Sequence, residues 1–175
     1  MKKHFLIVFV FLISCNLSVG QDITHTQSNH SISANLFGLD YAYEQSLGGS
    51  WSILGRVGFE PIEVGGYTDD HDESHYQFSP RPALSIEPRY YFNLVRRARN
   101  GCNIDRNAAD FLSVKALTAK LYSGHRDDIA FCVSAQYGIR RVWDCFYIEP
   151  SIGITYHAWF KDWLPEIQFR FGYSF

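Results

Sequence analysis

Ser151, His157 and Glu149 are the residue types of an acyl-hydrolysing triad. In such a triad, a serine nucleophile needs a histidine base within hydrogen-bond reach, and a carboxylate orients that base. Along one extended strand, however, Glu149 and His157 would be separated by roughly 26 Å, at about 3.3 Å per residue. These three residues cannot form a triad alone. Ser31 and His30 are an alternative serine and histidine pair. We predict no catalytic site.

A run of carboxylates and histidines from Asp69 to His75 has residue types that could bind a divalent cation. The run lacks the central glycine of a calcium loop, and its spacing does not match a closed zinc site. We therefore predict a solvated surface loop, with no metal and no cofactor.

Acidic and basic residues also recur at alternate positions within segments that have the pattern of strands. Side chains on a strand alternate between its two faces, so these charged residues would share the face opposite the apolar one. Four acids against five bases predict a buried network of ion pairs, and the alternative is a proton path or a narrow ion channel. The set consists of Asp40, Arg56, Glu60, Glu87, Arg89, Lys115, Arg140, Glu149 and Arg170.

The elements that must position these side chains are strands of about ten residues with a period of two. In the last of them, Phe169, Phe171, Tyr173 and Phe175 alternate with polar residues or glycine. Six further segments show the alternation, more weakly in residues 111–122 than elsewhere. The seven segments are residues 31–43, 51–60, 83–92, 111–122, 129–140, 145–157 and 164–175.

An apolar face opposite a polar face rich in small residues is typical of transmembrane β-barrel strands. Lipid leaves no partner for an unpaired sheet edge, so the sheet must close. We predict an all-β fold, a closed antiparallel transmembrane β-barrel. The alternative is a secreted soluble β-sandwich or lipocalin-like barrel with its apolar face inward. In that fold the aromatic last strand would be an unfavourable edge strand, because a hydrophobic edge can pair with another chain.

Seven strands conflict with the even number expected when both chain ends lie on the same side of a membrane. We therefore predict eight strands, with the missing one in residues 22–30 or, alternatively, in residues 62–80. Connections 44–50, 93–110 and 141–144 would then face the periplasm. Connections 61–82, 123–128 and 158–162 would face outward.

The first 20 residues have the features of a secretory signal peptide. Lys2 and Lys3 precede an apolar stretch, Phe5 to Ile13, and small residues precede Gln21. The predicted domain organisation is a signal peptide over residues 1–20 and a barrel over 21–175, with lipidation of Cys15 as an alternative. The sequence is 17% aromatic, 19% charged and has a net charge of −2, which argues against disorder and against a nucleic-acid partner.

Three cysteines follow the predicted signal peptide, so at most one disulfide can form within a chain. Cys102 and Cys145 would both lie at the periplasmic rim, and the periplasm is oxidising. We predict a possible Cys102–Cys145 disulfide, with Cys132 as a free thiol inside the barrel.

The final segment, Gln168 to Phe175, resembles the C-terminal signal by which outer-membrane β-barrels are recognised for assembly. Residues 88–93 and 138–141 are similar to segments of small outer-membrane proteins of the Bacteroidetes type. The resemblance implies a bacterial outer-membrane location, with membrane lipid and the barrel assembly machinery as partners. It also implies an assembly signal at Phe169, Phe171, Tyr173 and Phe175.

The function expected from these observations is that of an integral outer-membrane barrel with a filled interior. Its role would be structural or would involve a surface interaction with an unidentified extracellular or periplasmic protein. Lipid A deacylases and acyltransferases occur on this fold, so a lipid-modifying enzyme is one alternative. A small transport pore is the other.

Overall fold

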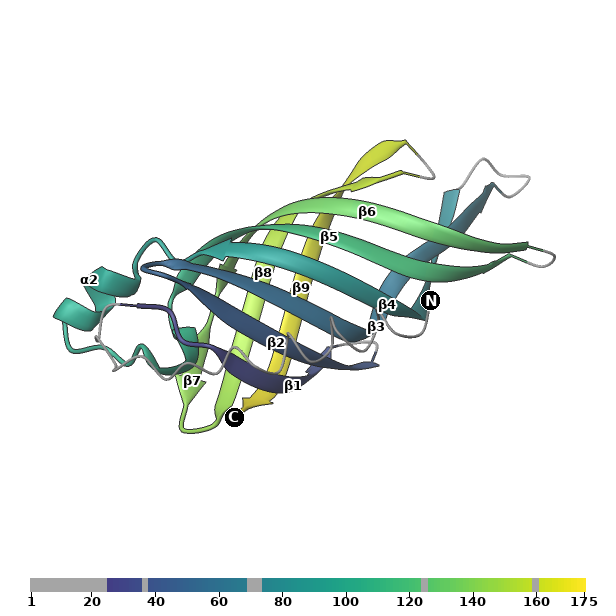
Figure 1. Ribbon diagram of the computed structural model, residues 1–175. Helices are drawn as coiled ribbons and strands as arrows, with labels where there is room; N and C mark the ends of the chain where they lie inside the picture. Colours follow the sequence, from purple (N-terminus) through teal and green to yellow (C-terminus); the bar gives the residue numbers. More distant parts are fainter. Residues whose placement is uncertain (1–24, 36–37, 69–73, 124–125, 159–160) are drawn as a thin grey trace, which may run out of the picture.

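The computed structural model describes residues 25–175, apart from 36–37, 69–73, 124–125 and 159–160. Eight long strands in the described part form the wall of a barrel, and short elements gather at one end of it (Figure 1). The short elements are a helix, a 3-10 turn at Asp105–Asn107 and strand β7. The barrel strands are β1 (Asn29–Asn35), β2 (Gly38–Gly48), β3 (Trp51–Thr68), β4 (Ser74–Tyr90), β5 (Asp110–Ser123), β6 (Arg126–Ile139), β8 (Phe146–His157) and β9 (Asp162–Ser174), and the others are α2 (Leu94–Arg99) and β7 (Arg141–Trp143).

The sheet closes on itself. Consecutive wall strands pair antiparallel from β1 to β6, β6 pairs with β8, β8 with β9, and β9 with β1. The closing β1–β9 pairing runs from Ser31 opposite Ser174 to Asn35 opposite Arg170. The predicted all-β, closed, antiparallel, eight-stranded barrel is therefore confirmed.

The predicted position of the eighth strand was wrong. The predicted single strand over residues 31–43 divides into β1 and β2, which pair with each other from Asn29–Glu44 to Asn35–Gly38. The alternation changes phase between them, because the exposed Ile32 is at an even position and the exposed Leu39 at an odd one. A change of phase indicates a turn, and this signal in the sequence was overlooked.

The described parts of residues 62–80 supply no additional wall strand, and strand pairing covers much of the predicted outer loop at 61–82. The segment extends β3 and β4 beyond their predicted ends, with Ile62 opposite Ser79 and Thr68 opposite Ser74. The two strands project as a long hairpin from the end of the barrel opposite α2 (Figure 1).

The connection between β4 and β5 is ordered by a small apolar cluster at one rim. Leu94 of α2 is fully buried with Tyr91, Ala109 and Phe111. The turn after β2, this connection and the β7–β8 turn all lie at this end, as do the last residues of β9. None of the helices in the described residues is long and apolar enough to cross a membrane.

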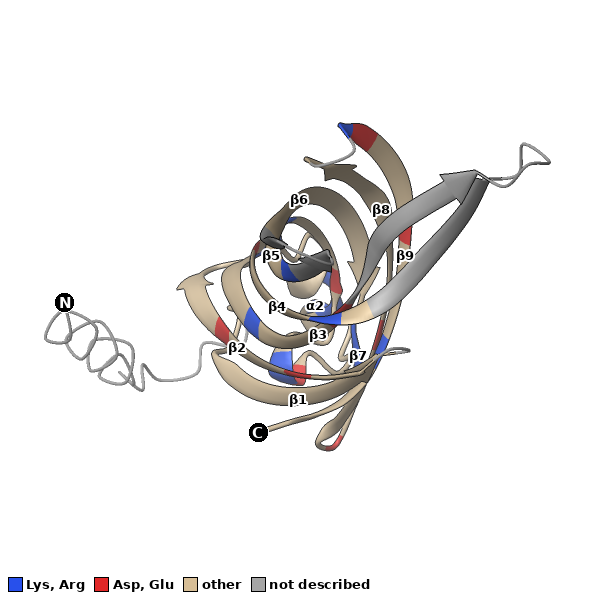
Figure 2. Ribbon diagram, turned by 90° about the vertical axis from the view of Figure 1, so that its right-hand side faces the viewer, with Lys and Arg blue, Asp and Glu red and all other residues tan. Residues whose placement is uncertain are grey.

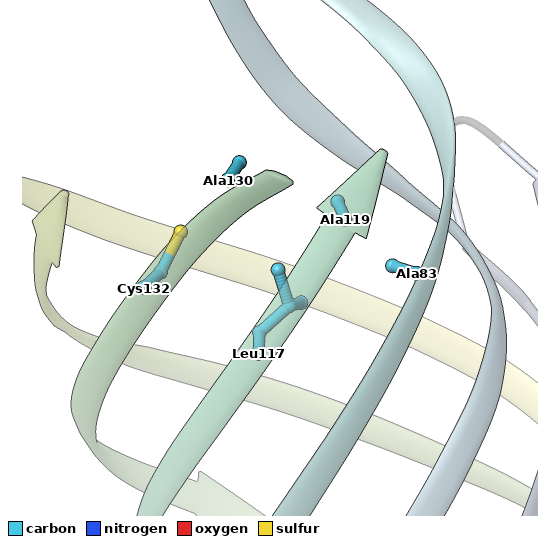
Figure 3. Close-up of a cluster of buried hydrophobic side chains, with 5 residues drawn as sticks. All are labelled: Ala83, Leu117, Ala119, Ala130 and Cys132. Carbon is cyan, nitrogen blue, oxygen red and sulfur yellow. The ribbon is translucent and has the colours of Figure 1, made fainter. Parts of the chain in front are cut away.

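The two faces of the wall differ sharply in chemistry. Large apolar side chains on the outside are between 37% and 79% exposed, including Leu84, Ile152 and Phe171. At the end opposite α2, the inner faces of β4, β5 and β6 carry a cluster of mostly small apolar side chains, shown in Figure 3. The remainder of the interior is predominantly polar. The cluster consists of Ala83, Leu117, Ala119, Ala130 and Cys132.

Candidate functional site

The charged residues predicted to face inward all lie inside the barrel. Each of the nine is at most 4% exposed, and they come from seven strands or strand ends. In Figure 2, segments coloured as acidic and as basic residues are seen around the wall of the barrel. The nine side chains lie within one enclosed space because period-two alternation continues around a closed wall. Ion pairs join eight of them directly, whereas Lys115 pairs with Glu166 and is linked to Arg170 of this network through the side chain of Gln168.

Glu149 on β8 is the centre of the network. Arg89 on β4 donates two hydrogen bonds to it across the barrel, from Nη1 to Oε2 at 2.9 Å and from Nη2 to Oε1 at 2.8 Å. Arg140 lies 3.4 Å from Oε2, and Arg56 lies 3.7 Å from Oε1. One carboxylate thus meets three guanidinium groups, a geometry that stabilises its negative charge in a buried setting.

The network continues toward the other end of the barrel. Arg56 is 3.2 Å from Asp40 and 3.6 Å from Glu87, which also pairs with Arg89 at 2.9 Å. Arg170 on β9 is 3.6 Å from Asp40 and donates to Glu60 on β3 at 2.6 Å. The two Arg170 contacts tie β9 to β2 and β3, which are not its neighbours in the sheet.

Two inward-facing acids, the buried Glu44 and the part-buried Glu166, were missed by the sequence analysis. Glu44 accepts hydrogen bonds from Tyr91 at 2.7 Å and from Ser52 at 2.5 Å, and it lies 3.3 Å from Arg140. It was assigned to a turn because the single predicted strand over residues 31–43 ended one residue before it. Its even position continues the inward series of Asp40 and Ala42, so the alternation alone could have revealed it.

Glu166 is the partner of Lys115. The Lys115 ammonium donates to it at 2.6 Å, and Gln136 and Thr155 donate to its other oxygen at 2.7 and 2.5 Å. Glu166 has the same parity as the predicted inward residue Arg170, four positions later. The inward position of Glu166 could therefore have been predicted from the same periodicity, although the sequence analysis did not name this residue.

Two arginines of the network also lie against aromatic rings inside the barrel. The Arg89 guanidinium is 4.2 Å from the ring centroid of Phe111, and Arg140 is at the same distance from Tyr147. Planar guanidinium groups stack well on aromatic faces. These contacts hold both guanidinium planes in place while their edges bind the carboxylates.

The structure does not assemble the hydrolytic residues. Glu149 is held by arginines, whereas His157 lies at the far end of β8 with Nδ1 at 3.8 Å from the Cys132 sulfur. Among the described residues there is no group of three or more potential metal ligands. The acidic part of the predicted loop, residues 69–73, lies outside the described residues.

The predicted Cys102–Cys145 disulfide is absent, and all three described cysteines are free thiols. Both residues do lie at the α2 end of the barrel. Cys102 is exposed after α2, whereas Cys145 in the β7–β8 turn lies 3.7 Å from the Arg106 guanidinium. Sharing a rim does not by itself bring two thiols to bonding geometry, which requires Cα atoms within about 7 Å.

The four aromatic residues of the predicted assembly signal lie on the outer face of β9. They are between 44% and 55% exposed. The last of them, Phe175, exchanges two backbone hydrogen bonds with His30, at 2.9 and 2.8 Å, and its ring stacks on the His30 ring. The segment thus lies where the first and last strands close the barrel.

No protein-family model matches the sequence, and no curated protein matches it. The chain is similar to a solved structure. It is the backbone structure of the Yersinia pestis outer membrane protein Ail in a phospholipid bilayer nanodisc, with a TM-score of 0.40 and 13% sequence identity. The similarity covers 85% of this chain and 100% of that chain.

Deleting Phe175 is expected to weaken closure of the barrel. The deletion removes both backbone bonds to His30 and the ring contact, at a cost of about 2 kcal/mol for two hydrogen bonds. Replacing Ile167, an exposed residue on the same strand, with alanine is the matched control. Folded protein is measured as the heat-modifiable band on a gel, and full recovery of folded barrel after the deletion would contradict the expectation.

Proposed function

We propose that this chain is an integral outer-membrane β-barrel with a closed, side-chain-filled interior, acting as a structural or surface-interaction protein. The observation that carries the proposal is the distribution of side chains between the two faces of the wall. Apolar side chains cover the outside, and matched charges are buried inside. A water-soluble barrel has the opposite arrangement, because its apolar face must be removed from water. Lipid is the environment in which this exterior is stable.

Aromatic residues on the outer wall support the placement in a membrane. Trp51, Tyr90, Trp143 and Tyr173 are exposed near the α2 end, and Trp163 is exposed near the other end. Tryptophan and tyrosine concentrate at the two membrane–water interfaces. We infer that these residues mark the borders of the membrane-spanning part.

The interior contacts favour a barrel filled by its own side chains over an open pore. A barrel of eight strands is just wide enough to be filled by its own side chains. Arg89 and Glu149 reach each other across the space, and Arg170 reaches Glu60. We propose that this network stiffens the wall and that the protein acts through its outer hairpins, without catalysis.

Membrane insertion without conductance is the expected result for the purified protein. Folded protein should float with phospholipid vesicles in a density gradient, and it should produce no stepwise current in a planar bilayer. A large porin is the positive control for the current. Failure to float would contradict the proposed membrane insertion, whereas stable current steps would contradict the proposal that side chains fill the interior.

The enzymatic alternative has a separate test. Mass spectra of lipid A from cells with and without the protein are expected to be the same. A new deacylated or acylated species that depends on the protein would overturn the proposal of a non-catalytic role.

A further inference from the structure

The outer wall has a groove near the α2 end, between the ends of β3 and β4 and the neighbouring β5 and β6. Its volume is about 550 Å³, within the range of pockets that hold small molecules. Most of the side chains along it are apolar and partly exposed. It is lined by Trp51, Pro88, Tyr90, Leu112, Ser113, Val114, Ala135 and Gln136.

A local break in the sheet explains why the groove exists. β4 and β5 pair from Ala83–Ala119 to Ile86–Ala116 and again from Arg89–Ser113, but Glu87 and Pro88 have no partners on β5. Proline has no amide hydrogen to donate to a neighbouring strand. On its other side, Pro88 remains paired with Ile53 of β3. At this point β4 is therefore paired with β3 on one side, whereas its pairing with β5 is interrupted on the other.

The groove has apolar walls and an aromatic end. Leu112 and Val114 are each 51% exposed, and the centroids of the Trp51 and Tyr90 rings lie 4.7 Å apart. Under the proposed function, this surface faces the hydrocarbon region of the bilayer. An acyl chain is the ligand whose shape and chemistry match such a groove.

The short helix α2 starts directly at the rim above the β4–β5 break. Asn93, just before the helix, accepts a hydrogen bond from the amide of Asp110, the first residue of β5, at 2.8 Å. The Leu94 amide in turn bonds to the Tyr91 carbonyl next to the end of β4. α2 is thus anchored to both strands that border the groove.

Two arginines on α2 are free to bind an anion. Arg96 and Arg99 are exposed and have no ion-pair partner among the described residues. Three positions apart, they lie on the same side of the helix. Arg97, in contrast, is engaged with the carbonyls of Ala108 and Asn103. The unpaired positive charges therefore lie on α2, six and nine residues after Tyr90, the groove residue at the end of β4.

We propose that the groove and these two arginines together form a binding site for one anionic phospholipid of the periplasmic leaflet. An acyl chain occupies the groove, and Arg96 and Arg99 bind the headgroup phosphate. Guanidinium groups pair with phosphate through charge-assisted hydrogen bonds. The inference rests on the proposed membrane insertion, with the α2 end toward the periplasm.

The test uses the folded full chain in vesicles of phosphatidylcholine with a minority of phosphatidylglycerol. After extraction in mild detergent, native mass spectrometry counts the lipids that remain bound. We expect phosphatidylglycerol to be enriched roughly tenfold over its share of the vesicle lipid. The R96Q/R99Q double variant should lose the enrichment, and Lys161→Gln at the opposite end should keep it.

A second pair of variants tests the groove. Val114→Trp fills it and should reduce bound phosphatidylglycerol and phosphatidylcholine, whereas Ile152→Trp, which adds the same ring elsewhere on the outer wall, should not. Unchanged enrichment in R96Q/R99Q, or equal retention of both lipids by the wild-type chain, would overturn the lipid site. If the wild-type chain floats with vesicles but shows no enrichment, only this inference fails; if it does not float, the membrane proposal fails as well.

Discussion

Replacing Glu149 with leucine is expected to lower the free energy of unfolding by about 3 to 5 kcal/mol. The carboxylate accepts two hydrogen bonds from Arg89, and it also lies within 4 Å of Arg140 and Arg56. Its removal leaves three guanidinium groups in a buried space with one fewer negative charge. An uncompensated buried charge costs much more than the net value of an ion pair.

Urea titration of the folded barrel in lipid vesicles, followed by gel mobility, measures this loss. Glu149→Gln keeps the shape and one acceptor oxygen, so it should cost less than the leucine variant. Asp162→Asn removes a charge from an exposed position and should change stability by no more than about 0.5 kcal/mol. Wild-type stability in Glu149→Leu would show that the interior is solvated and would favour the pore.

Replacing Gly58 with valine is expected to cost about 3 kcal/mol or more, the upper end of the range for overpacking. A Cβ atom at residue 58 would lie 2.5 Å from the Asp40 Cα and 2.6 Å from the Leu39 carbonyl oxygen. Both are backbone atoms of β2, the strand paired with β3 at this point. Relief of the overlap requires the two strands to separate, which also moves Asp40 away from Arg56.

Gly55→Val on the same strand is the matched control. A Cβ atom at residue 55 would meet nothing within 4 Å, and the side chain would point away from the interior. We expect its stability to stay within about 0.5 kcal/mol of the wild-type value. Similar losses in the two valine variants would indicate a general effect on strand propensity and would contradict the close-approach explanation.

The interior network also explains why so charged a core is compatible with a stable wall. Arg89 and Glu149 are 60 residues apart in sequence, and Arg170 and Glu60 are 110 apart. Such pairs form only when distant strands meet in the closed barrel. The same ion pairs therefore favour the closed sheet over open or slipped arrangements.

Alternation by itself determined which side chains face inward. A strand has a fixed period of two, so each charged residue in a strand was assigned to a face without knowledge of any partner strand. This is why Asp40, Arg56 and Arg170 were identified from the sequence. Glu44 was missed because alternation does not mark where a strand begins or ends, whereas Glu166 lay within the predicted strand 164–175 and its inward parity was overlooked.

The tertiary structure decided which acid meets which base. That choice depends on the closing of the sheet and on the offset between neighbouring strands, neither of which leaves a local signal. Lys115 was placed with the predicted acids of one network, yet its ion-pair partner is Glu166, which the sequence analysis did not name. Cys102 and Cys145 share a rim but remain free thiols.

The break between β4 and β5 near α2 also has one part that the sequence determines and one part that only the tertiary structure determines. A proline weakens the pairing of any strand that contains it, because proline cannot donate to a sheet, and this property of Pro88 can be read from the sequence alone. That the break lies next to Leu112 and Val114, with α2 anchored at its end, follows only from the pairing of β4 with β5. Local chemistry determines what each segment can do, whereas closure brings segments distant in sequence close enough to interact.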